Sequence, residues 1–300
     1  MGPHMFVEVN QALERIRATG WLNSSEWPTS AQISPADVDL SEAEGRLFRA
    51  TPADEMDVER LDGLARLAGL ELAIEHYPVI DSTNRLLMQR MQAEPTGNLL
   101  VVCDYQRAGR GRRGRQWISP YARSLAFSYA HASSKALHEF GGLSCVVGLA
   151  VLDVLIDLGV EGARLKWPND VWIQGSKLAG ILVELANRGS STIAVIGLGM
   201  NIALTPEERA AVDQPIADLL SRGVAVDRNS LLMAFVEKMA SYLRHFEHSG
   251  FEAFRSAFDA VHLLHRRDVV VHSATEGKSL LTHGSVEGVG GSGQLLIRTS

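Results

Sequence analysis

The order of strand-like and helical segments after residue 70 is the feature that most constrains the fold. Two helical patterns occur, over about 82–92, which Asp81 or Ser82 can cap, and over 141–158, where apolar residues recur on one face. A short strand-like run, 171–173, follows them. The other strand-like runs are 71–77, 98–105, 124–130, 178–185 and 191–198. This order is not a strict βαβ alternation, so it predicts an α+β fold with a mixed sheet packed against helices.

Two further regions flank this predicted sheet. The N-terminal region has amphipathic patterns within 6–20 and 54–67, separated by a Ser/Pro/Asp-rich loop at 23–45. A long helix is expected over about 229–248, and the segment after it contains short strand-like runs separated by glycine. The predicted organisation is a cloning remnant at 1–5, a small helical region at 6–70, the main domain at 71–262 and a small β module at 263–300.

The composition excludes several classes of protein. The chain has 300 residues, with 29 Lys and Arg against 35 Asp and Glu, so its net charge of −6 does not suit a bulk polyanion binder. A hydrophobic content of 46% excludes a disordered chain. No uninterrupted apolar run reaches the roughly 18 residues of a membrane span, and no secretory signal is present. Cys103 and Cys145 each lie in an apolar run. We therefore expect a cytoplasmic protein without a membrane segment or a disulfide framework.

A loop rich in arginine and glycine, GRGRRGRQW at 109–117, is the most distinctive motif. Together with Arg107 it contributes five arginines within 107–115 and no acidic residue. Glycines allow backbone N–H groups to approach a ligand closely, and arginines bind phosphate while keeping their charge. The loop is therefore predicted to fold over a ligand that bears phosphate.

The same loop matches two other patterns. Gly109, Gly111 and Gly114 match the GxGxxG fingerprint of dinucleotide-binding folds, but that motif requires its last glycine to begin a helix, and Pro120 leaves no room for one. An Arg/Gly nucleic-acid tail is usually terminal and long, whereas this run is short and lies between two apolar segments. Both interpretations are disfavoured. The sequence also lacks a P-loop and the HExxH and CxxC metal motifs.

A second cluster, KWPND at 166–170, lies close in sequence to GSKLAGILVE at 175–184. Turn-forming residues explain part of the pattern, but they do not explain why Lys166 and Lys177 both lie near one acid, Asp170. A lysine can neutralise a phosphate or a carboxylate, and Asp170 could hold Mg²⁺. Structural ion pairs give the same pattern, so this cluster alone leaves both interpretations open.

Five segments together resemble the bacterial biotin protein ligase (biotin–[acetyl-CoA-carboxylase] ligase) family. The resemblance covers about 71–270, and its segments occur in the family's order. They are PVIDSTN (78–84), QRAGRGRRGRQW (106–117), KWPNDV (166–171), KLAGILVE (177–184) and GLGMNI (197–202). The resemblance implies a catalytic domain like that of class II aminoacyl-tRNA synthetases and a C-terminal SH3-like β module.

The resemblance also implies a two-step reaction. Biotin and ATP would form biotinyl-5′-AMP with Mg²⁺, and a lysine of the biotin carboxyl carrier protein would then receive the biotin. The implied catalytic residues are Lys177, Arg112 and Arg110. The implied biotin site comprises Ser82, Thr83, Asn84, Gln106, Arg110, Gly111, Arg112, Lys177 and Gly180. The implied nucleotide site comprises Arg112, Arg115, Trp117, Asn169, Asp170, Lys177 and Asn201, with Asp170 on the Mg²⁺ side.

Two departures from the family pattern matter. Some members carry an N-terminal winged helix that represses biotin-synthesis genes, but 6–70 lacks a convincing helix-turn-helix and is acidic, so DNA binding is not expected. The last family strands are not found before Ser300, so the β module is expected to be incomplete. The sequence leaves open whether two copies form a homodimer. A lipoate or octanoate transferase is the nearest rival, but it should lack the tandem GRGRRGR loop.

Overall fold

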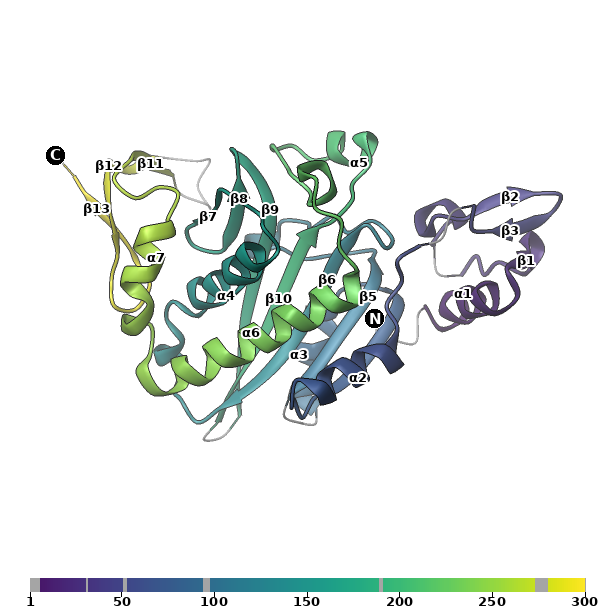
Figure 1. Cartoon of the computed structure of the whole chain (residues 1–300), viewed down its shortest axis with the longest axis horizontal. Helices are drawn as coiled ribbons and strands as arrows, with labels where there is room; N and C mark the ends of the chain where they lie inside the picture. Colours follow the sequence, from purple (N-terminus) through teal and green to yellow (C-terminus); the bar gives the residue numbers. More distant parts are fainter. Residues whose placement is uncertain are drawn as a thin grey trace.

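The computed structural model describes residues 6–30, 32–50, 53–93, 98–188, 191–272 and 280–299 (Figure 1). Residues 1–5, predicted to be a cloning remnant, lie outside these ranges. A seven-stranded sheet forms the body of the described chain, and only its β4–β5 pair is parallel, which confirms the mixed sheet. In spatial order the strands are β4 (Ala73–Ile80), β5 (Leu99–Gln106), β6 (Ser124–Ser133), β10 (Ser191–Asn201), β9 (Ser176–Arg188), β8 (Asp170–Ile173) and β7 (Ala163–Lys166).

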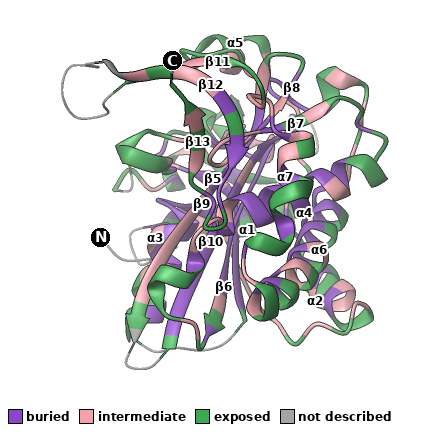
Figure 2. Ribbon diagram, turned by 90° about the vertical axis from the view of Figure 1, so that its left-hand side faces the viewer, coloured by how far each residue is buried: buried purple, intermediate pink, exposed green. Residues whose placement is uncertain are grey.

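Helices cover both faces of this sheet. On one face, α3 (Thr83–Ala93) packs on β5, β6, β9 and β10. On the other face, α4 (Leu143–Asp157) and α6 (Arg228–Ser249) pack together over the sheet. Because successive side chains of a strand alternate between faces, β5 contributes Leu100 and Val102 to one core and Val101 and Cys103 to the other. Buried residues accordingly gather in the central strands (Figure 2).

The predicted helix at 141–158 is confirmed as a core helix. The helical stretch Leu137–Asp157, which joins the short 3₁₀ helix η5 (Leu137–Phe140) to α4, is apolar and long enough to cross a membrane by length and composition. However, 67% of its apolar window is buried inside the structure. Cys145 of α4 and Cys103 of β5 are both buried and free. Burial raises the pKa of the Cys145 thiol to about 12, so it is protonated at neutral pH.

The prediction that 6–70 is a helical region is wrong in two respects. First, a three-stranded sheet forms in and around the 23–45 segment that was expected to be loop, and α1 (Val7–Thr19) packs against its strand β1. The elements between residues 21 and 48 are β1 (Trp21–Asn23), η2 (Ser24–Glu26), η3 (Pro35–Val38), β2 (Ser41–Ala43) and β3 (Arg46–Phe48). Secondly, α2 (Val58–Leu67) contributes Leu61 and Ala65 to the core of the large sheet, and not to the separate core around α1.

A buried charged network ties the segment before α2 to the large sheet. Asp104 of β5 and Arg228 of α6 are fully buried, and Arg228 Nη1 lies 2.9 Å from Asp104 Oδ1. His76 Nε2 lies 2.7 Å from Asp104 Oδ2, and the Met56 N–H donates to Asp104 at 3.1 Å. Burial by itself raises the pKa of Asp104, but the His76 hydrogen bond and the Arg228 charge outweigh it and hold the pKa below its ordinary value.

The C-terminal residues form a small antiparallel sheet beyond α6. The connecting elements are η7 (Glu252–Phe254) and α7 (Arg255–Val261). The sheet comprises β11 (Asp268–His272), β12 (Leu280–Val289) and β13 (Leu295–Arg298), in that order. It contacts the main domain where the Trp167 indole Nε1 donates to the Gly293 carbonyl at 2.8 Å. The short connections α5 (Pro206–Ala210) and η6 (Leu220–Arg222) complete the described helices.

Candidate active site

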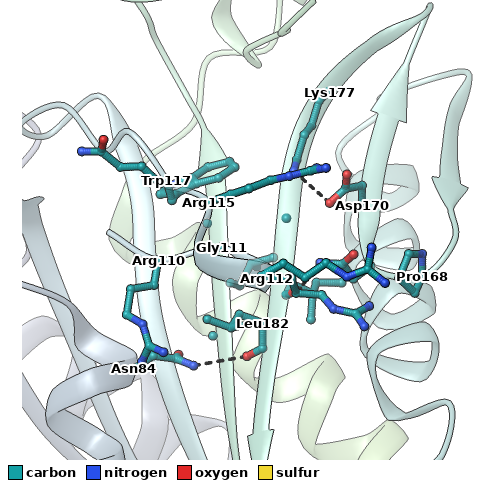
Figure 3. A pocket seen from close by; sticks show the side chains of 18 of the residues that line it. Asn84, Arg110, Gly111, Arg112, Arg115, Trp117, Pro168, Asp170, Lys177 and Leu182 are labelled. Carbon is teal, nitrogen blue, oxygen red and sulfur yellow. Dashed lines mark hydrogen bonds and ion pairs between the residues drawn. The ribbon is translucent and has the colours of Figure 1, made fainter. Parts of the chain in front are cut away.

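A cavity of about 410 Å³ opens at one end of the large sheet (Figure 3). The structure brings nearly all of the residues predicted for the site into this cavity; the exception is Asn201. The predicted residues that line it are Ser82, Thr83, Asn84, Gln106, Arg110, Gly111, Arg112, Arg115, Trp117, Asn169, Asp170, Lys177 and Gly180. Residues separated by almost one hundred positions in sequence therefore share one pocket.

The floor of the pocket is a buried polar cluster. Parallel pairing of β4 and β5 sets Ile80 opposite Gln106, so the turn that begins α3 lies beside the end of β5. The Thr83 N–H and Oγ1 both donate to Gln106 Oε1, at 3.0 and 3.3 Å. The single hydroxyl hydrogen of Ser128 in β6 is shared between two acceptors, Thr83 Oγ1 at an O–O distance of 2.8 Å and Asn84 Oδ1 at 2.5 Å. Because each side chain is held by another, the floor presents a fixed set of donors and acceptors to a ligand.

The Arg/Gly loop, residues 109–117, folds as a hairpin between β5 and β6. The Trp117 N–H donates to the Gly109 carbonyl at 2.9 Å, and the Gly111 N–H donates to the Arg115 carbonyl at 2.7 Å. At the tip, the only helical geometry in the described loop is the three-residue η4 (Arg112–Gly114). The last glycine therefore does not begin a helix of the kind that a dinucleotide-binding motif requires, and that alternative is excluded.

The arginines of this loop differ in their partners. Arg110 forms a two-point ion pair with Glu184 of β9, with N–O distances of 3.1 and 3.3 Å. Arg112, Arg113 and Arg115 are exposed and line the pocket, and they form no ion pair with any residue that the structure describes. The rim of the pocket therefore carries positive charge that no described carboxylate neutralises.

Trp117 returns the loop to the sheet and packs over two glycines. An added Cβ on Gly199 would lie 2.5 Å from the Trp117 ring, and one on Gly180 would lie 3.5 Å from it. The Trp117 Nε1 atom is buried and has no hydrogen-bond partner among the described residues. The indole therefore packs against the sheet through the edge that carries its unused N–H donor.

Lys177 and Asp170 come together because β8 and β9 form a hairpin. Their side chains form an ion pair, with Nζ 2.9 Å from Oδ1. The Lys177 Nζ atom also lies 5.6 Å from the centre of the Trp117 ring. The KWPND segment thus brings its acid to the lysine of KLAG, whereas the Lys166 Nζ atom lies 4.0 Å from the centre of the Trp172 ring.

The side-chain amides of Asn169 and Asn201 both donate hydrogen bonds to backbone carbonyls. The Asn169 amide donates to the Ile181 carbonyl at 2.7 Å, which ties the β7–β8 turn to β9, and Asn169 still lines the pocket. Asn201 is buried at the end of β10, and its amide donates to the Ala217 carbonyl at 3.0 Å. Asn201 is not among the described residues that line the pocket, so the structure does not bring it together with the other residues predicted to bind the nucleotide. Asn201 instead anchors the segment 214–217.

That segment contains a pocket residue that the sequence analysis missed. The Lys177 N–H donates to the Pro215 carbonyl at 2.9 Å, and the Ala217 N–H donates to the Lys177 carbonyl at 2.9 Å. These bonds hold the neighbouring Gln214 at the pocket wall. No sequence signal marked Gln214, because its place depends on backbone pairing with a strand 37 residues earlier.

The metal-binding capacity of the pocket is limited to one carboxylate. Among the described residues, no group of three or more His, Cys, Asp or Glu side chains could hold a metal ion. Asp170 is the only carboxylate among the described residues that line the pocket. Mg²⁺ commonly binds through one or two carboxylates plus the phosphates of its nucleotide, so this donor set fits an ion that arrives with ATP better than a resident metal.

Comparisons with known proteins agree with this geometry. The model of the Biotin/lipoate A/B protein ligase family matches residues 76–201, which include the floor, the loop and the lysine–aspartate pair. The fold and the site therefore define a protein of the biotin and lipoate ligase class.

Relatives and solved structures narrow this class. The chain is 32% identical over 224 residues to the biotin–[acetyl-CoA-carboxylase] ligase of Paracoccus denitrificans, covering 73% of this chain and 91% of that protein. It is 38% identical over 197 residues to the bifunctional ligase/repressor BirA of Escherichia coli, covering 65% of this chain and 60% of BirA. A biotin protein ligase of Aquifex aeolicus in complex with biotin and ATP superposes with a TM-score of 0.62 at 27% identity, covering 76% of this chain and 92% of that one. The chain belongs to the biotin protein ligase family.

Proposed function

We propose that this protein activates biotin with ATP to form biotinyl-5′-AMP and then transfers the biotinyl group to a lysine of a biotin carboxyl carrier protein. The observation that carries the proposal is the charge of the pocket. Arg112, Arg115 and Lys177 face a cavity in which Asp170 is the only lining carboxylate among the described residues. Because the first step must bring a carboxylate and a polyphosphate together, a pocket with excess fixed cations suits it.

In the proposed first step, a carboxylate oxygen of biotin attacks the α-phosphorus of ATP. A new O–P bond forms, the bond from the α-phosphorus to the bridging oxygen of the β-phosphate breaks, and pyrophosphate leaves with that electron pair. Lys177 and Arg112 would stabilise the charge that develops on the phosphoryl oxygens. The biotin ring system would rest on the floor formed by Ser82, Thr83, Asn84 and Gln106, with Gly180 leaving room beside it.

The nucleotide would lie on the side of Trp117. An indole that packs against two glycines offers an aromatic face for stacking, and Arg115 stands at the same rim. Asp170, with Asn169 beside it, would hold a Mg²⁺ ion that arrives with ATP and neutralises phosphate charge.

In the proposed second step, the amine of the acceptor lysine attacks the carbonyl carbon of the mixed anhydride. An amide bond forms, AMP leaves, and the amine loses its proton. The name of the Paracoccus relative supports acetyl-CoA carboxylase as the source of the acceptor. Because an acyl adenylate hydrolyses readily, the Arg/Gly loop would exclude water until the acceptor arrives.

Biotin-dependent exchange between ATP and pyrophosphate, measured with Mg²⁺, tests the first step without an acceptor. We expect exchange with biotin and none with lipoate or octanoate. Exchange with lipoate but not with biotin would replace the proposal with a lipoate ligase. The absence of exchange together with no rise in melting temperature on adding biotin would refute it outright.

A further inference from the structure

Glu184 of β9 joins the floor of the pocket to the Arg/Gly loop. Its Oε2 accepts a hydrogen bond from the Asn84 amide at 3.0 Å, and its two carboxylate oxygens face the two terminal nitrogens of Arg110 at 3.1 and 3.3 Å. Figure 3 shows Arg110 reaching from the loop down beside Asn84. One carboxylate therefore holds a residue of the floor and a residue of the loop at the same time.

The orientation of Asn84 is fixed from the opposite side. Its Oδ1 accepts from Ser128 Oγ, so its amide nitrogen must point towards Glu184. Gly197 of β10 leaves the space that Asn84 occupies, since an added Cβ there would collide with Asn84 Oδ1. A ligand that rearranges the floor therefore changes the partner of Glu184 directly.

The rest of the loop has few attachments to the sheet. Its backbone hydrogen bonds at Gly109, Gly111 and Trp117 join the loop to itself. Of the four arginines in the loop, Arg110 alone forms an ion pair with a described residue. At the other end, Trp117 attaches the loop by packing. The Arg110–Glu184 pair is thus the polar attachment of the loop to the sheet in the described part of the chain.

We propose that Glu184 is a positioning residue that holds the Arg/Gly loop closed over the pocket through Arg110. The inference rests on the proposed function, which it deepens. It also gives Arg110 a different role from the other arginines of the loop. The charge of Arg110 is already matched by a two-point partner, so Arg110 holds the loop in place, and Arg112 and Arg115, which form no ion pair with a described residue, remain for the substrate anions.

Limited digestion with trypsin tests this role without any ligase activity. Trypsin cleaves after arginine, so a loop with several arginines reports its own opening when opening is fast relative to cleavage. Glu184→Gln keeps the shape of the side chain and removes its charge. We expect loop cleavage to accelerate about three- to fivefold, as expected for losing a partly exposed ion pair, while the melting temperature stays within 2–3 °C of the wild type.

The matched control is Glu247→Gln. Glu247 pairs with His131, its side chain is 23% exposed against 24% for Glu184, and it lies away from the loop on α6. This variant should leave loop cleavage unchanged. Glu184→Asp, which is one methylene shorter, should be cleaved at an intermediate rate and provides a second test if Glu184→Gln fails to fold.

A double variant separates action through Arg110 from any other action. Arg110→Gln should accelerate cleavage at the remaining arginines of the loop. The double variant Glu184→Gln/Arg110→Gln should be cleaved no faster than Arg110→Gln alone. Activity adds a second measurement, since an open loop releases biotinyl-5′-AMP into solution at a higher rate per turnover.

Three outcomes decide the matter. Cleavage of Glu184→Gln at the wild-type rate would overturn the proposal. Additive effects in the double variant would also overturn it, because Glu184 would then act elsewhere. Faster cleavage in a protein that lacks biotin-dependent exchange would uphold the attachment of the loop and refute the ligase function, so the two failures are distinguishable.

Discussion

Substituting Gly199 with alanine should selectively weaken the binding of ATP. The new Cβ would lie 2.5 Å from Trp117 Cε2 and 2.7 Å from its Nε1. Ordinary van der Waals contact begins near 3.4 Å, so the two groups must separate by about 1 Å. Because β10 is an inner strand paired on both sides, the ring on the loop moves and the strand does not.

Overpacking of this kind costs about 1–3 kcal/mol. If Trp117 stacks on the nucleotide as proposed, the KM for ATP in biotin-dependent exchange should rise about five- to 150-fold. The KM for biotin should change by less than about threefold, because the floor of the pocket is not touched.

Two other glycines provide a graded control. Gly180→Ala would place its Cβ 3.3 Å from the Lys177 side chain and 3.5 Å from Trp117, so a smaller increase in the KM for ATP is expected, together with an increase in the KM for biotin because Gly180 also lies beside the proposed biotin site. Gly63→Ala in α2 meets nothing within 4 Å and should leave kinetics unchanged. A KM for ATP of Gly199→Ala within twofold of the wild type would refute the placement of the nucleotide against Trp117. A rise in the KM for biotin alone would show that Trp117 lies against biotin and not against the nucleotide.

Three further predictions follow from single contacts. Lys177→Ala should reduce exchange at least about a hundredfold while the melting temperature is retained, since it removes a cation that meets the developing charge; normal exchange would refute its role. Arg228→Met should lower the free energy of unfolding by about 3–5 kcal/mol in a denaturant titration, because it removes the buried guanidinium that pairs with the buried Asp104 and leaves that carboxylate only its His76 and Met56 hydrogen bonds, and a loss below 1 kcal/mol would contradict this. Burial lowers the pKa of His262 to about 4, so the unfolded state takes up this proton first as the pH falls. Stability should therefore decline between about pH 6.5 and 4, by about 3 kcal/mol at most, and His262→Phe should remove this component of the decline.

Five strands of the large sheet, β4, β5, β6, β9 and β10, were predictable because each is at least eight residues long and rich in apolar residues, whereas the four-residue β7 has no such run and was not predicted. The residue types of a run such as Leu99–Gln106 are enough to predict a buried strand. Helix caps and the spacing of apolar residues predicted α3, α4 and α6. The three-residue strands β1, β2 and β3 were missed because so short a segment has no periodicity to detect. The contribution of α2 to the core of the large sheet was also missed, because an amphipathic pattern predicts an apolar face but does not identify the surface on which that face packs.

The residues of the site also fall into those that the sequence predicted and those that it did not. The Arg/Gly loop and the KWPND and KLAG segments concentrate their chemistry within a few residues, so the sequence by itself determined the charge of the pocket and the class of ligand that suits it. The contacts of Asn201, Gln214 and Glu184 do not follow from local sequence in this way, although Asn201 and Glu184 belong to the GLGMNI and KLAGILVE segments. Only the tertiary structure removed Asn201 from the pocket, brought Gln214 into it and matched Glu184 to Arg110. The physical reason is that the chemistry of a motif belongs to its side chains, whereas the partner of an isolated polar residue is fixed by strand pairing and packing across the fold.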